Sequence, residues 1–122
     1  MTSSERGEIE ATVTRYFEGM RDADVDTLAS AFRDDAGFYG FVGDDLYAGP
    51  ITHLYDWVAA NLTPGASGPD FKLEFQSVEQ HGPIASVTCR ELGFVGHDLL
   101  EYFTLLKANG SWKITSKLFA AL

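Results

Sequence analysis

Two ionisable residues near the end of the chain, Glu101 and Lys117, stand in segments that are otherwise mostly apolar. If these segments are extended, alternation places Glu101 on one face with Phe103, and Lys117 on one face with Phe119. Burying either charge alone would be costly, so the two side chains either pair with each other or line a cavity. An apolar cavity with a few polar groups is the usual form of a small-molecule site. Glu101 and Lys117 are therefore candidates for a ligand-binding centre, with a plain ion pair as the alternative.

A third acidic residue, Glu91, continues the alternating face of Ala85, Val87 and Cys89. It is a further candidate for the pocket, although Gly93 predicts a bend nearby. Cys89 itself is interpreted as a small buried apolar side chain. No histidine or aspartate is spaced around it as a nucleophilic cysteine requires.

The histidines offer one candidate base. His53 and Trp57 are separated by one helical turn, so they can share a helix face at the mouth of a pocket. If His53 points inward, it is a suitable proton acceptor near neutral pH; the alternative is an exposed histidine beside a half-buried tryptophan. His81 and His97 stand in turns, where we expect solvated side chains.

Two pairs of aspartates flank the stretch FRDDAGFYGFVGDD at residues 32–45. They lack the alternating ligands, the sixth-position glycine and the closing glutamate of a calcium loop. We interpret Asp34 and Asp35 as the end of a helix, and Asp44 and Asp45 as part of a hairpin turn. We expect no metal site and no cofactor, because phosphate-binding glycine loops and serine nucleophile motifs do not occur either.

The charge balance restricts the partners. Nine Lys and Arg against eighteen Asp and Glu give a net charge of −9 over 122 residues, which disfavours nucleic acid and anionic membranes. No apolar run approaches the roughly 20 residues that span a bilayer. The single cysteine permits no internal disulfide, and the first residues resemble no export signal, so we expect a cytoplasmic protein.

The elements that must position these residues follow from apolar spacing and turn signals. Helical spacing predicts three helices, at residues 4–20, 25–32 and 51–62, with Asp24 capping the second. A short hairpin is predicted at residues 38–47 and a loop at residues 63–69. Four strands then form an antiparallel meander, at residues 71–80, 84–95, 99–107 and 112–119.

These elements predict an α+β fold in a single domain spanning residues 1–122. In the last strand, alternation places Trp112, Ile114 and Leu118 on the face opposite Lys117. Both faces of the sheet are largely apolar, and three helices can cover only one of them. We therefore expect a homodimer that forms through the uncovered sheet face.

Three stretches, taken with the order of the elements, resemble the nuclear transport factor 2-like superfamily: RYFEGMRDADVDTLASAFRDDAGFYGF, YAGPITHLYDWV and HDLLEYFTLLKANGSWKITSKLF. The resemblance covers nearly the whole chain. It looks closest to the group described as putative lumazine-binding, a relative of the SnoaL-like polyketide cyclases and the ketosteroid isomerases. It implies a cone-shaped fold, in which three N-terminal helices pack on a strongly bent, mostly antiparallel sheet. It implies fold rather than activity, because the superfamily hosts several chemistries on one scaffold.

The resemblance to ketosteroid isomerases also implies site positions. Tyr16 matches the tyrosine that donates a hydrogen bond to the substrate carbonyl, Glu101 matches the carboxylic acid that shares this role, and Phe119 matches an aromatic beside the bound rings. The position of the proton-shuttling aspartate is occupied by Gly40, so we expect no isomerisation by that route. Lys117 would keep a paired Glu101 ionised and so weaken it as a donor.

The first functional hypothesis is a protein that binds a small apolar molecule, planar or polycyclic and bearing an oxygen. Its pocket would be lined by aromatic and ionisable residues: Tyr16, Phe38, Trp57, Phe103, Lys117 and Phe119, with Glu91 as a further candidate. A cofactor-independent isomerase, cyclase or dehydratase is the second hypothesis, with Tyr16, Glu101 and His53 as catalytic residues. An interaction module without a usable cavity is the third.

Overall fold

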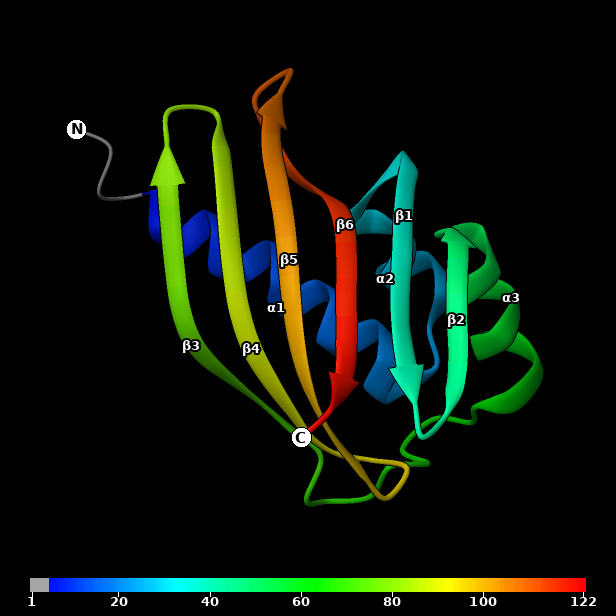
Figure 1. Ribbon diagram of the computed structural model, residues 1–122. Helices are drawn as coiled ribbons and strands as arrows, with labels where there is room; N and C mark the ends of the chain where they lie inside the picture. Colours follow the sequence, from blue (N-terminus) through cyan, green and yellow to red (C-terminus); the bar gives the residue numbers. More distant parts are fainter. Residues whose placement is uncertain (1–4) are drawn as a thin grey trace.

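The computed structural model describes residues 5–122, which form three helices and six strands (Figure 1). The helices are α1 (Glu5–Asp22), α2 (Val25–Ser30) and α3 (Thr52–Asn61). The strands are β1 (Phe32–Val42), β2 (Asp45–Pro50), β3 (Lys72–His81), β4 (Ile84–Phe94), β5 (His97–Ala108) and β6 (Ser111–Ala121). The predicted start of the first helix at Ser4 lies outside the described residues. The α+β architecture expected from the sequence is confirmed.

Helix α1 crosses the inner face of the sheet and buries one stripe of side chains against it (Figure 1). Its buried residues include Ile9, Val13, Tyr16 and Met20, which recur at helical spacing. No helix within residues 5–122 combines the length and the apolar character needed to cross a membrane.

Helix α2 begins as predicted but ends earlier. The Asp24 side chain accepts a hydrogen bond from the Thr27 amide at 3.2 Å and caps the helix. The helix ends at Ser30, and the Ile114 amide donates to the Ala31 carbonyl at 2.9 Å. The predicted helical position of Phe32 is therefore wrong, because pairing with β6 draws the chain into β1 at that residue.

The aspartates at positions 34 and 35 do not close a helix, and that prediction is wrong. Both lie in β1, in a segment where the register with β6 shifts between Phe32 and Gly37. Their side chains are exposed, and Asp35 pairs with Arg33 at 2.8 Å. They are polar residues of an irregular strand that follows immediately after α2.

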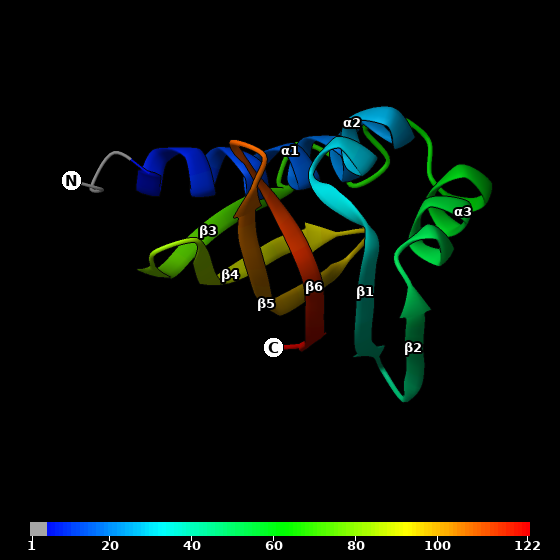
Figure 2. The same cartoon turned by 90° about the horizontal axis from the view of Figure 1, so that it is seen from above.

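The six strands form one sheet in the order β2-β1-β6-β5-β4-β3. Strands β3 to β6 pair antiparallel in sequence order, which confirms the predicted meander, and β1 pairs with β6 in parallel. The sheet curves strongly, with the helices on its inner side, when it is seen from above (Figure 2). The cone-shaped fold with a mostly antiparallel sheet is therefore confirmed.

A bulge in β6 changes which residues face the core. Thr104 pairs with Ser116 but Leu105 pairs with Ile114, so Thr115 is the extra residue. Trp112 and Ile114 are consequently buried on the same side as Lys117, while Leu118 is exposed. The prediction that Trp112 and Ile114 share a face with Leu118 is wrong, because strict alternation fails across a bulge.

The outer face of the sheet carries large apolar side chains that the helices do not cover. Tyr39, Tyr102 and Leu118 are each about half exposed, and the register places Leu118 beside both tyrosines. Phe41 and Ile84 are exposed to a similar degree. The inner face forms the core and lines the candidate site.

Candidate functional site

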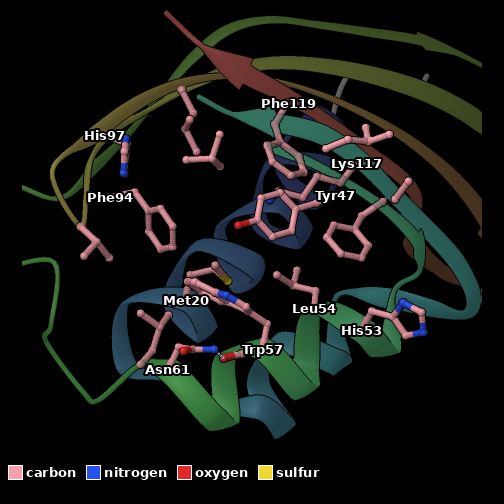
Figure 3. A pocket seen from close by; sticks show the side chains of 17 residues that line it. Met20, Tyr47, His53, Leu54, Trp57, Asn61, Phe94, His97, Lys117 and Phe119 are labelled. Atoms are coloured by element: carbon pink, nitrogen blue, oxygen red, sulfur yellow. Dashed lines mark hydrogen bonds between the residues drawn. The ribbon is translucent and has the colours of Figure 1, made fainter. Parts of the chain in front are cut away.

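A cavity of about 500 Å³ lies between α3, β2 and the inner faces of β5 and β6 (Figure 3). This volume is in the range of small-molecule sites. Most of the side chains around it are aromatic or aliphatic. The lining residues are Met20, Phe38, Val42, Leu46, Tyr47, Ala48, His53, Leu54, Trp57, Asn61, Leu62, Phe94, Val95, His97, Leu99, Lys117 and Phe119.

Phe119 closes the position that, in the resemblance to ketosteroid isomerases, would hold the base. Gly40 and Phe119 are partners in the register of β1 and β6. A Cβ at Gly40 would lie 2.5 Å from Cγ of Phe119, and closer still to the Phe119 carbonyl oxygen. The glycine therefore admits the ring, which also lies parallel to Phe38 at a centroid distance of 6.2 Å. No side chain can act as a base at position 40, as the sequence predicts.

Lys117 brings a charged group to the cavity wall. Its side chain is only 3 % exposed, and its Nζ lies 4.1 Å from the Phe119 ring centroid and 5.1 Å from that of Tyr16. Both distances fit cation–π contacts. The same Nζ lies 3.5 Å from Oε2 of Glu101. The predicted ion pair therefore forms, and one of its members also lines the cavity.

Behind Lys117, the hydroxyl of Tyr16 donates a hydrogen bond to Oε2 of Glu101 at 3.1 Å. Both residues are fully buried, and Oε1 of Glu101 has no hydrogen-bond partner within residues 5–122. Burial and the adjacent Glu101 raise the pKa of Tyr16 well above its usual value, so the phenol remains a donor. The fold therefore brings together Tyr16 and Glu101, the two residues that the resemblance to ketosteroid isomerases pairs.

Glu91 completes a buried cluster with Tyr16, Glu101 and Lys117. It is fully buried, and neither of its carboxyl oxygens has a hydrogen-bond partner in the described part of the chain. Burial raises its pKa well above the usual value, and the charge of Glu101 adds to this, while Lys117 acts in the opposite direction. Burial therefore favours the protonated form of Glu91. The cluster contains an ion pair, a phenol and a second carboxyl group, which are groups that can polarise a carbonyl and move protons.

The strands explain why these residues meet. Cys89, Glu101 and Phe119 follow one another across β4, β5 and β6, so Glu91 lies diagonally next to Glu101. The register of β4 and β5 shifts beyond Glu91, where the Gly93 amide donates to Asp98 at 2.9 Å. The bend predicted at Gly93 therefore begins after Glu91 and leaves its side chain pointing inward.

The predicted site residues fall into two groups. Phe38, Trp57, His53, Lys117 and Phe119 line the cavity. The other four do not reach its wall and lie in the core behind it: Tyr16, Glu91, Phe103 and Glu101. Lys117 is the residue that joins the two groups.

His53 does not take the inward position that a base would need. Its side chain is exposed, and its ring points away from the centre of the cavity (Figure 3). A Cβ atom at Gly49 would lie 2.9 Å from Nδ1 of His53, so the histidine ring covers the end of β2. Of the two alternatives that the sequence left open, the structure has the exposed histidine beside a half-buried tryptophan, because α3 turns Leu54 and Val58 towards the core instead. Cys89 is buried as predicted, and burial raises the pKa of its thiol.

Several cavity residues were not foreseen from the sequence. Tyr47 comes from β2, Phe94 and Val95 from the turn between β4 and β5, and Asn61 from the end of α3. His97, interpreted as a solvated turn residue, also lines the cavity. Leu99 lies on the same face of β5 as Glu101, as alternation along the strand predicts. The others required knowledge of which ends of the elements meet.

The turn between β4 and β5 has an unusual backbone. Val95 has a φ of 44° and Gly96 a φ of 84°, the left-handed pattern of a tight hairpin. A β-branched residue rarely adopts this conformation, so the flanking strands impose it. No group of three or more His, Cys, Asp or Glu residues suited to a metal ion is found among residues 5–122.

Comparisons with known proteins place this geometry in a family. The family model described as putative lumazine-binding matches residues 4–120. A curated protein named aldolase FrzH, from Cladobotryum sp, is 28 % identical over 120 residues, which is 98 % of this chain and 93 % of that protein.

Solved structures agree with the fold. A protein of unknown function from Shewanella baltica OS155, described as NTF2-like, is 27 % identical with a TM-score of 0.88, covering 100 % of this chain and 97 % of the other. A second NTF2-like protein, from Methylobacillus flagellatus KT, is 24 % identical with a TM-score of 0.89, covering 100 % and 95 % of the two chains.

Proposed function

Because the chain belongs to the family described as putative lumazine-binding, within the nuclear transport factor 2-like superfamily, we propose that it is a small-molecule binding protein. Its ligand is planar, largely apolar and bears an oxygen. Lumazine itself is planar and bicyclic and has carbonyl oxygens, but its four ring nitrogens make it more polar than the ligand proposed here.

One observation carries the proposal: a cavity of about 500 Å³ with a mostly apolar wall and a buried ammonium group. The rings of Phe38, Phe119, Tyr47 and Trp57 supply flat surfaces against which a planar ligand can stack. Lys117 is placed to donate a hydrogen bond to the ligand oxygen, since its ion pair with Glu101 uses only one direction of the ammonium group.

Thermal unfolding in the presence of pteridines, flavins, steroids and polyketide aromatics tests the proposal. A ligand at one hundred times its Kd stabilises the protein by about 2.7 kcal/mol. For a domain of this size, that corresponds to a rise in Tm of roughly 10 °C. If no compound of any of these classes raises the Tm, the proposal is wrong.

Tryptophan fluorescence then locates the ligand. Trp57 lines the cavity, whereas Trp112 is buried elsewhere in the core. Binding should change the emission of the wild-type protein, and the change should be lost in Trp57→Phe while the rise in Tm remains. A change that persists in Trp57→Phe would place the ligand outside this cavity.

A second candidate function is a cofactor-independent enzyme that acts on a carbonyl compound. The buried cluster of Tyr16, Glu91, Glu101 and Lys117 favours it, since these groups can exchange protons next to the cavity. The 28 % identical relative named an aldolase supports the same chemistry. Proton exchange at the α-carbon of 2-tetralone in D₂O, followed by NMR, is the test. An exchange rate equal to that of buffer, for a ketone that binds, would contradict this candidate.

We also propose that the protein forms homodimers through the outer sheet face and acts in the cytoplasm. The exposed Tyr39, Tyr102 and Leu118 support the dimer, because they form an apolar surface that a second copy can cover. The single cysteine, which is buried and unpaired, is in keeping with a reducing compartment.

A further inference from the structure

Lys117 differs from the other three lysines of the chain. The side chain of Lys72 is 62 % exposed, Lys107 pairs with Glu5 at 2.6 Å at the surface, and Lys113 donates to the Ser30 carbonyl at 2.6 Å. Lys117 is buried, lines a cavity, and has no neutral hydrogen-bond acceptor within the described residues. A primary amine so placed meets whatever enters the cavity and is shielded from bulk water.

We propose that Lys117 forms an imine with an aldehyde or ketone bound in the cavity, so that the site takes carbonyl compounds covalently and reversibly. This inference rests on the proposed function, because the carbonyl compound must first enter the cavity as a ligand. It assigns to Lys117 a reactive role that goes beyond a hydrogen bond to the ligand oxygen.

The neighbours of Lys117 supply what imine formation needs. A lysine amine attacks a carbonyl only after it has lost a proton, and Oε2 of Glu101 lies 3.5 Å from Nζ as an acceptor for that proton. The flexible four-carbon stem allows Nζ to turn from Glu101 towards the cavity. The rings of Tyr16 and Phe119 lie 5.1 and 4.1 Å from Nζ and help to shield it from water that would hydrolyse the product.

The reaction balances within this cluster. Glu101 takes a proton from the Lys117 ammonium. The nitrogen lone pair then attacks the carbonyl carbon, the π electrons of the C=O bond move to the oxygen, and a proton passes from the attacking nitrogen to that oxygen, giving a neutral carbinolamine. The C–O bond then breaks as the nitrogen lone pair forms the C=N bond. The proton held by Glu101 passes to the departing hydroxyl, which leaves as water. The products are a protonated imine on Lys117, one water molecule and an ionised Glu101.

Charge conservation is the physical argument that favours this step. Leaving a buried carboxylate without its partner would cost several kcal/mol. The protonated imine keeps one positive charge on the Lys117 nitrogen, so Glu101 retains a cationic partner before and after the reaction. Burial raises the pKa of the neighbouring Glu91 and so disfavours a second negative charge beside Glu101.

Reductive trapping tests the proposal. The full chain is incubated with a low concentration of 2-naphthaldehyde and sodium cyanoborohydride, which reduces a protonated imine to a stable secondary amine. Peptide mass spectrometry then measures the naphthylmethyl group on each lysine. We expect Lys117 to be labelled at least about tenfold faster than the exposed Lys72, because binding raises the local concentration of the aldehyde. 2-Methylnaphthalene, which has no carbonyl, should slow the labelling of Lys117 and leave that of Lys72 unchanged.

The matched variant is Lys117→Arg, which keeps a positive charge beside Glu101 but forms no imine under these conditions. Its Tm shows whether it folds, and its Trp57 fluorescence shows whether the cavity still binds 2-methylnaphthalene. The fast labelling seen at position 117 should be absent from the variant, and only its surface lysines should be labelled, at the same slow rate as in the wild-type protein.

Two results would overturn the inference, and they differ in what they leave standing. If 2-methylnaphthalene changes the Trp57 emission but Lys117 is labelled no faster than Lys72, the imine is wrong and the binding function stands. If 2-methylnaphthalene does not bind and Lys117 is labelled no faster, the imine is wrong and the binding function loses support from this ligand class.

Discussion

Replacing Glu91 by glutamine should remove a pH-dependent loss of stability from the protein. Glu91 is fully buried next to Glu101, and burial raises its pKa well above the ordinary value of 4.5. Glutamine has nearly the same shape and is neutral at every pH. The variant therefore keeps the packing and removes only the titration.

The sign follows from where the proton binds. In the unfolded chain Glu91 ionises above about pH 4.5, whereas in the folded protein it stays protonated to a higher pH. Its stabilising contribution is thus fully present below pH 4.5 and is lost as the pH rises towards the folded pKa. One proton difference changes the free energy of unfolding by about 1.4 kcal/mol per pH unit. Between pH 5 and pH 7 the wild-type protein should lose up to about 2.7 kcal/mol relative to Glu91→Gln.

Urea unfolding of both proteins at pH 5, 6 and 7 measures this difference. Carboxyls whose pKa is lowered in the fold, such as Glu5, Asp22 and Asp24, act mainly below pH 4.5 and are common to both proteins. Glu79→Gln is the matched control, because Glu79 lies on β3 with an exposed side chain. Its effect should be nearly the same at the three pH values.

Parallel stability curves for wild type and Glu91→Gln would refute the reasoning. They would mean that Glu91 ionises in the folded protein as readily as in the unfolded one. The opposite trend, in which the wild-type protein gains stability relative to Glu91→Gln from pH 5 to pH 7, would show that the folded protein favours the ionised form of Glu91. The assignment of a protonated Glu91 would then be wrong.

Three further predictions concern the packing and assembly. Lys117→Met should lower the free energy of unfolding, measured with urea, by about 3–5 kcal/mol, because it leaves Glu101 buried without its cation. Adding Glu101→Gln should recover most of that loss, and a double variant no more stable than the single one would contradict the ion-pair explanation. Gly40→Ala should destabilise the protein by about 1–3 kcal/mol through the clash with the neighbouring strand. Gly7→Ala is the control and should stabilise the protein by about 0.5–1 kcal/mol, because Gly7 is exposed in α1 with open space around it. Equal effects of the two substitutions would refute the close packing at position 40. Tyr102→Glu should convert the dimer to a monomer in size-exclusion chromatography with light scattering, and a wild-type protein that is already monomeric would refute the dimer.

The core of the candidate site could be predicted because its signals are local. Alternation over a few residues places Glu101 with Phe103, and Lys117 with Phe119, whatever the strands pair with. Helical spacing likewise placed Tyr16 on the buried stripe of α1. Once both segments are inward and adjacent, the contact between Glu101 and Lys117 follows.

The parts that were missed depend on partners that the sequence does not name. The bulge at Thr115 reverses the alternation of β6, and its cause is the pairing with β5. The sequence left His53 open between an inward and an exposed position, and the packing of Leu54 and Val58 against the core decides for the exposed one. The early start of β1 at Phe32 likewise results from its pairing with β6.

The sequence by itself determined the type and order of the elements and the inward direction of the ionisable residues, because both depend on periodicities of a few residues. The tertiary structure decided that Lys117 alone of the buried cluster reaches the cavity, that the Phe119 ring covers Gly40, and that burial raises the pKa of Glu91. Those properties arise from distances between strands and from exclusion of water, and both exist only once the sheet has closed around the helices.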